Sequence, residues 1–220
     1  MLLGYIGILI IRGEKMKKLL LLLFIVFMTG CDNSIEEIED YKPVLYFYPE
    51  EDINVSVKFS HPEYLLTTYP KYDNGWEVKV LKNGTIVDKN REYYALYWDE
   101  KSKDENNFEE GFYVDGDSAI SFLEEKLKII GLTDRETNEF IMYWLPVLEK
   151  NKKSIVNFDF TDELQKDNKI MINPKPDNLF RVNINIKKVD NKVKIKQQSL
   201  ERVNREGFTV VSWGGSIYDK

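Results

Sequence analysis

Alternating apolar and polar positions dominate the chain after residue 42. In the stretch 53–59 every second residue is apolar, and the same alternation is clearest over 180–187. A period of two is typical of strands with one buried face. Shorter apolar runs between turn residues predict further strands. These strands are expected at 44–48, 64–69, 76–81, 85–87, 93–98, 108–114, 155–160, 170–172, 192–196 and 209–213, the last ending at Gly214-Gly215.

A helical period replaces the alternation near the middle of the chain. Asp117 is placed to cap a helix over 118–130, because its carboxylate can accept the first free backbone N–H groups. Thr133 and Glu136 have the spacing of a capping box for a second helix, which should end near residue 145 because Pro146 disturbs it. We therefore predict an α+β fold: an antiparallel β-sheet or small β-sandwich with an inserted helical hairpin at about 117–147.

The N-terminal region has the pattern of an export signal. Two lysines precede a ten-residue apolar run, 19–28, and Thr29-Gly30 then precede Cys31, the one cysteine of the chain. The run is too short to span a membrane, which needs about 20 apolar residues. Residues 16–30 resemble a bacterial lipoprotein signal peptide, and the resemblance implies diacylglyceryl attachment to Cys31, although Met28 stands where leucine is usual. The alternative is a plain signal peptide with an incidental cysteine.

Residues 1–15 do not fit such a signal, because a second apolar run precedes a charged segment there. We expect translation to begin at Met16. After cleavage, residues 31–41 would form a lipidated cysteine and an acidic tether, and residues 42–220 a single globular domain.

Composition narrows the possible functions. The 220 residues carry 31 basic and 37 acidic side chains, and cleavage after residue 30 would leave a net charge of about −9. Nucleic-acid binding is disfavoured, since it needs a basic face. With its one thiol lipidated, the mature chain would have no disulfide, and no metal or other cofactor is expected. His61 is the one imidazole and no G-x-S-x-G motif occurs, so no catalytic residue is assigned.

Two groups of side chains remain as candidates. Asp99, Glu100, Glu109 and Glu110 flank an aromatic strand and could supply the carboxylate pair of a glycan hydrolase. The aromatic side chains could instead stack on sugar rings or on a protein. Within one strand over 93–98, Tyr93 and Tyr97 should share a face with Ala95, and Tyr94 and Trp98 should share the other face with Leu96. The candidate ligand-binding residues are Tyr93, Tyr94, Tyr97, Trp98 and Trp76. The alternative is that all of them belong to the core.

Motifs across nearly the whole domain resemble those of a bacterial lipoprotein family of uncharacterised activity. That family has a KPVIYLYP-like opening, here 42–49, and a GFTVVxWGG-like ending, here 207–215. The resemblance implies no catalytic residues. We therefore expect a lipid-anchored lipoprotein on the outer side of the cell membrane that acts as a non-enzymatic binding module with a glycan or protein partner. The alternatives are a carboxylate-dependent hydrolase of cell-envelope glycan and a structural envelope protein.

Overall fold

A computed structural model describes residues 38–102 and 106–218 of the chain, which belong to one compact unit, Glu37–Lys220. The expected signal peptide, the lipidation site Cys31 and the start of the tether lie outside the described residues. Strand β1 begins at Ile38, so residues 38–41, which were expected in the tether, are already part of the sheet.

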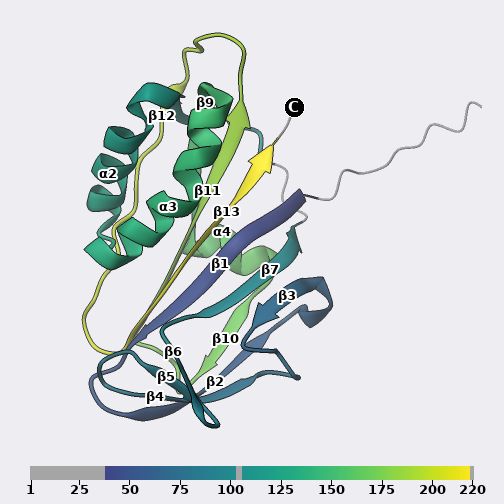
Figure 1. The fold of residues 1–220 in the computed structure, drawn as a ribbon, viewed down its shortest axis with the longest axis vertical. Coiled ribbons are helices and arrows are strands. Elements are labelled where there is room, and N and C mark those ends of the chain that lie inside the picture. Colours follow the sequence, from purple (N-terminus) through teal and green to yellow (C-terminus); the bar gives the residue numbers. More distant parts are fainter. Residues whose placement is uncertain (1–37, 103–105, 219–220) are drawn as a thin grey trace, which may run out of the picture. The chain divides into compact units, whose positions relative to one another are not determined.

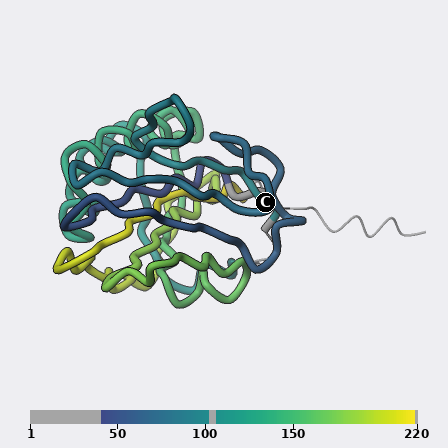
Figure 2. Tube along the Cα trace, turned by 90° about the horizontal axis from the view of Figure 1, so that it is seen from below, coloured from purple at the N-terminus to yellow at the C-terminus, as the bar shows by residue number. Residues whose placement is uncertain are grey.

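The larger of two sheets has eight strands in the order β12-β8-β9-β11-β13-β1-β7-β3. In Figure 2, β1 and β13 run side by side although they lie at opposite ends of the described chain. The strands are β1 (Ile38–Tyr48), β3 (Leu65–Tyr69), β7 (Leu96–Ser102), β8 (Glu110–Asp115), β9 (Lys153–Phe160), β11 (Asn178–Lys188), β12 (Lys196–Gln197) and β13 (Thr209–Tyr218).

The smaller sheet has five antiparallel strands in the order β10-β2-β4-β5-β6. They are β2 (Ile53–Phe59), β4 (Trp76–Val80), β5 (Ile86–Asp88), β6 (Arg91–Tyr93) and β10 (Ile170–Asn173). The helices are α2 (Ala119–Ile130), α3 (Asp134–Asn151), α4 (Thr161–Asp167) and the short 3₁₀ turns η1 (Pro62–Tyr64) and η2 (Gly116–Ser118).

The larger sheet separates two apolar cores (Figure 1). Helices α2 and α3 pack on one face, where Trp144 of α3 belongs to the same core cluster as Val44 and Trp213 of the strands. The smaller sheet packs on part of the opposite face, where its Trp76 joins Leu45 and other residues of the larger sheet. The molecule is therefore built in three layers, helix on sheet on sheet.

The expectation of an antiparallel sheet is wrong. The larger sheet is mixed, because β11 and β13 pair in parallel from Asn178 to Lys187, as do β12 and β8. Parallel neighbours need a long crossover, and the segment 189–208 supplies it between β11 and β13. This segment packs along the helices, where the Val203 N–H donates to the Ile130 carbonyl at 2.9 Å. The expected strand over 192–196 is wrong as well, since only the two residues of β12 pair with the sheet.

The helical hairpin is present, with differences at its ends. The Thr133–Glu136 capping box is confirmed by both of its hydrogen bonds. Asp117 lies in η2 and Ser118 occupies the N-cap position of α2. Helix α3 continues past Pro146 to Asn151, because the next turn buries Leu148 in the core. Helix α4 was not predicted.

Gly214 and Gly215 lie inside β13, whereas we expected them to end the strand. A Cβ atom on Gly215 would overlap the Ile184 carbonyl oxygen of β11 and lie 2.7 Å from Trp144 Cζ2 of α3. The absence of a side chain at this position lets the helix approach the sheet closely.

Gly215→Ala is expected to lower the free energy of unfolding by about 1–3 kcal/mol, because the new methyl group overpacks the contact between α3 and the sheet. Urea denaturation measures the change. Thr67→Ala on the exposed edge strand β3 is the control and should change stability by no more than about 0.5 kcal/mol. A Gly215→Ala protein as stable as the wild type would contradict this account of the packing.

Candidate functional site

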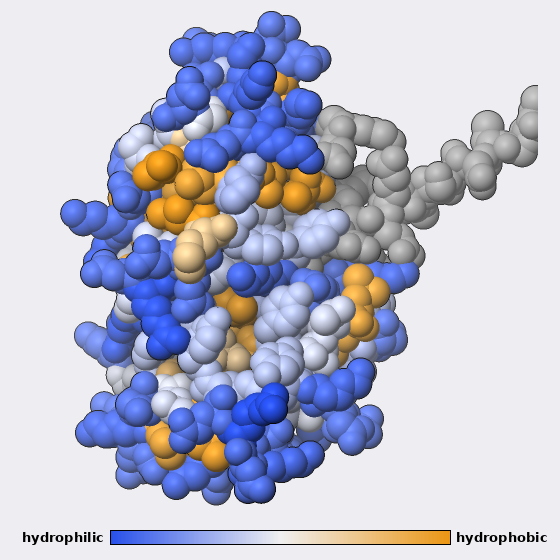
Figure 3. Space-filling model, viewed as in Figure 1, coloured by the Kyte–Doolittle hydropathy of each residue, from blue (hydrophilic) through white to orange (hydrophobic). Residues whose placement is uncertain are grey.

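A concave site lies between α3 and strands β1, β3, β6 and β7. Its volume is about 580 Å³, which is within the range of small-molecule pockets. We call it the tyrosine pocket. It is lined by Lys42, Val44, Tyr69, Glu92, Tyr93, Tyr94, Ala95, Tyr97 and Tyr143. Figure 3 shows weakly polar, pale side chains around apolar ones on this side of the molecule.

A break in the predicted strand over 93–98 creates much of this pocket. The chain leaves the smaller sheet at Tyr93, the end of β6, and enters the larger sheet at Leu96, the start of β7. Tyr94 and Ala95 belong to neither strand, so the alternation of faces does not hold across them. The prediction that Tyr94 points away from Tyr93 and Tyr97 is therefore wrong, and all three line the same pocket.

The other walls come from three elements that are distant in the sequence. Tyr69 ends β3, packs edge-on against Tyr93 with ring centroids 5.4 Å apart, and accepts a hydrogen bond from Arg91 at 3.1 Å. Tyr143 projects from α3, and Lys42 from an irregular step in β1. Tyr69 and Tyr94 are about half exposed, at 51% and 54%, so their rings are available to a ligand.

The two tryptophans of the candidate set are not part of this surface. Trp98 is fully buried and Trp76 is 3% exposed. Both lie in the core between the two sheets, where their ring centroids are 6.3 Å apart. Trp98 faces this core because the smaller sheet covers that side of β7. Tyr93, Tyr94 and Tyr97 thus keep their place as candidates, while Trp76 and Trp98 are core residues.

Three of the pocket tyrosines have a raised pKa. Burial, followed by the hydrogen bond to Asp99, raises the pKa of Tyr97 above its ordinary value. Burial and the charge of Glu139 raise the pKa of Tyr94, and burial and the charge of Asp99 raise that of Tyr143. An ordinary tyrosine already has a pKa of about 10, so all three rings keep their protons at neutral pH.

The sheet order separates the carboxylates that were considered for hydrolysis. Asp99 and Glu100 lie on β7, whereas Glu110 begins β8 and forms an ion pair with Lys196 at 3.0 Å. Four strands separate β7 from β8 in the sheet, which corresponds to a distance of about 24 Å. The two pairs therefore do not face each other across a common substrate site.

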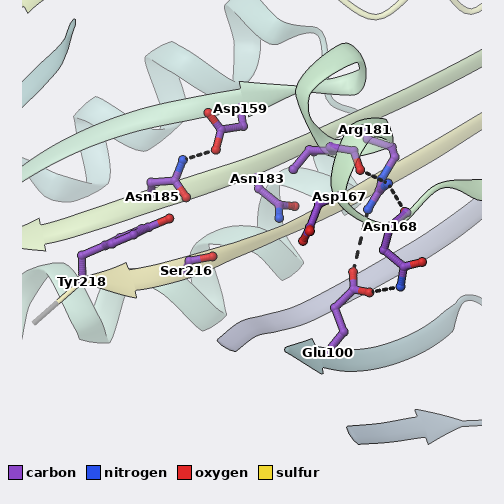
Figure 4. A pocket seen from close by; sticks show the side chains of 10 residues that line it. Glu100, Asp159, Asp167, Asn168, Arg181, Asn183, Asn185, Ser216 and Tyr218 are labelled. Atoms are coloured by element: carbon purple, nitrogen blue, oxygen red, sulfur yellow. Dashed lines mark hydrogen bonds and ion pairs between the residues drawn. The ribbon is translucent and has the colours of Figure 1, made fainter. Parts of the chain in front are cut away.

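Glu100 instead belongs to a buried polar cluster (Figure 4). Its carboxylate accepts hydrogen bonds from Trp98 Nε1 at 3.0 Å and from the Asn168 amide, and lies 4.0 Å from Arg181 Nη2. Asp159 and Asp167 lie nearby, but the cavity between these groups has a volume of only about 10 Å³. Such a space holds about one water molecule, so a sugar ring has no room beside Glu100.

A second hollow, of about 700 Å³, lies between β8, α2 and the segment 192–197, with Phe112, Phe122 and Lys126 in its lining. His61 lies on the surface, pairs with Glu63 at 3.0 Å and stacks on Tyr64, away from the tyrosine pocket. No group of three His, Cys, Asp or Glu side chains among residues 38–102 and 106–218 could hold a metal ion. Within the same residues, none of the helices has the length and apolar character needed to cross a membrane.

The described residues form a three-layer α+β fold with a pocket lined by tyrosines. Similarity to a known protein covers part of it: the chain is 32% identical over 77 residues to an uncharacterized protein in the bglA 3' region of Butyrivibrio fibrisolvens. The match covers 33% of this chain and 80% of that protein, and the chain belongs to the same family. No family model and no solved structure matches the chain.

Glu100→Gln is expected to gain stability relative to the wild type as the pH rises from about 4 to 8. Burial raises the pKa of Glu100 despite the opposing charge of Arg181. The unfolded carboxyl loses its proton near pH 4.3, whereas the folded one keeps it to higher pH. The wild type therefore loses stability above about pH 4.3, by up to about 1.4 kcal/mol per pH unit, until the folded carboxyl also ionises. Glutamine does not titrate. Urea denaturation at three pH values measures the difference.

Glu109→Gln is the matched control, because this side chain is exposed. Its stability relative to the wild type should stay nearly constant over the same pH range. If the free energy of unfolding of the wild type instead rose relative to that of Glu100→Gln as the pH increased, this result would contradict the raised pKa of Glu100.

Proposed function

We propose that this protein is a lipid-anchored binding module of the cell envelope and that the tyrosine pocket is its ligand site. The observation that carries the binding role is the gathering of Tyr69, Tyr93, Tyr94, Tyr97 and Tyr143 around one pocket of about 580 Å³. Tyrosine offers an apolar ring face and a polar hydroxyl group in one side chain. A saccharide has the same combination, with C–H faces on its ring and hydroxyl groups at its edge.

The size of the pocket favours a small ligand over a protein surface. Stable protein interfaces bury roughly 800 Å² on each partner, whereas this site is a hollow that takes a few sugar rings. Among its lining residues Glu92 carries the one carboxylate. Hydrolysis of a glycosidic bond needs two such groups. This composition supports binding without chemical change.

The anchor rests on the sequence alone. The lysine pair, the apolar run over 19–28 and the small residues before Cys31 support export and lipidation. Two or more acyl chains would hold the protein on the outer face of the cytoplasmic membrane, since each buried methylene contributes roughly 0.8 kcal/mol. The motifs at 42–49 and 207–215 support membership of a bacterial lipoprotein family.

Tyr94→Ala is expected to weaken the binding of neutral hexose tetramers about tenfold, because it removes a half-exposed ring that a sugar would cover. Titration of the purified full chain with tetramers of several linkages, followed by calorimetry or by NMR signals of the tyrosines, measures the affinity. Tyr113→Ala on β8 lies outside the pocket and should bind like the wild type. If no tetramer binds, or if both variants lose affinity equally, the pocket is not the saccharide site.

Cys31→Ser is expected to abolish incorporation of a clickable fatty acid and to leave the signal peptide attached, because the acyl acceptor is the thiol. Labelling in cells and the electrophoretic mobility of the protein measure both effects. Normal processing and labelling of the variant would exclude lipidation at Cys31.

A further inference from the structure

Lys42 is the one cation among the described residues that line the tyrosine pocket. Its ammonium lies 4.8 Å from the ring centroid of Tyr143 and 6.0 Å from that of the buried Trp213. No described residue forms a salt bridge with it. Aromatic faces stabilise a cation only in part, so the ammonium keeps its capacity to donate hydrogen bonds to a ligand.

The backbone holds Lys42 in place at a conformational cost. The pairing of β1 with both neighbouring strands shifts register at residues 41–44, and Lys42 has a φ of +53°. Residues with a Cβ atom rarely adopt this left-handed region, in which glycine or asparagine is more favourable. Bulges of this kind often redirect a side chain toward a functional site. This step of β1 places the Lys42 side chain in the lining of the tyrosine pocket.

Asp99 fixes this conformation and does not neutralise the ammonium through a salt bridge. One of its carboxylate oxygens accepts the backbone N–H of Lys42 at 2.8 Å, and the other accepts the hydroxyl group of Tyr97. Glu92, the one acidic residue in the lining, is exposed to water, whereas Lys42 is half-buried. The inner part of the pocket thus presents one ammonium, and the carboxylates of Asp99 and Glu139 lie near Tyr143 and Tyr94 without a salt bridge to it.

We infer that the tyrosine pocket selects saccharides that carry a carboxylate, with the Lys42 ammonium binding the carboxylate while the tyrosine rings pack on the sugar. This inference rests on the proposed function of the pocket as a saccharide site. A charge-assisted hydrogen bond is roughly twice as strong as a neutral one. The pocket should therefore prefer an acidic sugar to its neutral counterpart by about tenfold.

The test compares trigalacturonic acid with neutral galactotriose of the same linkage, using calorimetry on the purified full chain. The wild type should bind the acidic trisaccharide about tenfold more tightly, and 0.5 M salt should reduce this preference. Lys42→Met should abolish the preference, so that the ratio of the two affinities falls from about tenfold to about one. Lys42→Arg should retain most of the preference because it keeps the charge.

Lys152→Met is the matched control, because Lys152 is an exposed lysine that also has a positive φ, +65°, and does not line the pocket. It should keep the preference of the wild type. Binding of both sugars with equal affinity, or equal loss of preference in the two methionine variants, would overturn the role of Lys42 and leave the saccharide site standing. Failure of both sugars to bind, together with the neutral tetramers, would overturn the proposed function itself.

Discussion

The three layers depend on burial of strand β1 on both of its faces. Val44 and Tyr46 point into the core beneath the helices, whereas Leu45 and Phe47 point into the core beneath the smaller sheet. All four are at most 5% exposed. Strands buried on both sides have continuous apolar sequences, which is why this segment lacks polar alternation. One strand thereby joins two cores, and a polar substitution on either face would open one of them.

The same strand also positions the candidate site. The apolar part of β1 begins at Val44. The register shift just before Val44 places the Lys42 side chain in the lining of the tyrosine pocket. Tyr46, two residues into the buried part, donates a hydrogen bond of 2.5 Å to Glu139 of α3 and stacks against Tyr94 at 6.4 Å between ring centroids. The Arg135 guanidinium lies 4.5 Å from the ring centroid of Tyr94, which keeps 54% of its surface exposed. The pocket wall is thus supported by the contact between β1 and α3.

Local patterns in the sequence predicted local structure well. The capping box at Thr133 and the strand predicted from the alternation over 180–187 each depend on neighbours a few residues apart. Three features could not be predicted because they depend on distant partners. Parallel pairing of β11 with β13 requires the crossover over 189–208, extension of α3 past Pro146 requires the core around Leu148, and burial of Trp98 requires the smaller sheet. The positive φ of Lys42 carried no sequence signal, since lysine does not favour it.

The chemistry of the pocket favours recognition over catalysis. A general acid or base works best when its pKa is near the working pH, yet Tyr94, Tyr97 and Tyr143 have pKa values raised further from neutrality. Glu100, whose pKa burial raises toward that range, lies in a different part of the fold with space for about one water molecule. The Glu100 carboxyl group, whose pKa is raised, and the tyrosine pocket thus lie in separate parts of the fold. The lining of the tyrosine pocket offers rings, hydroxyl groups, one ammonium and the single carboxylate of Glu92.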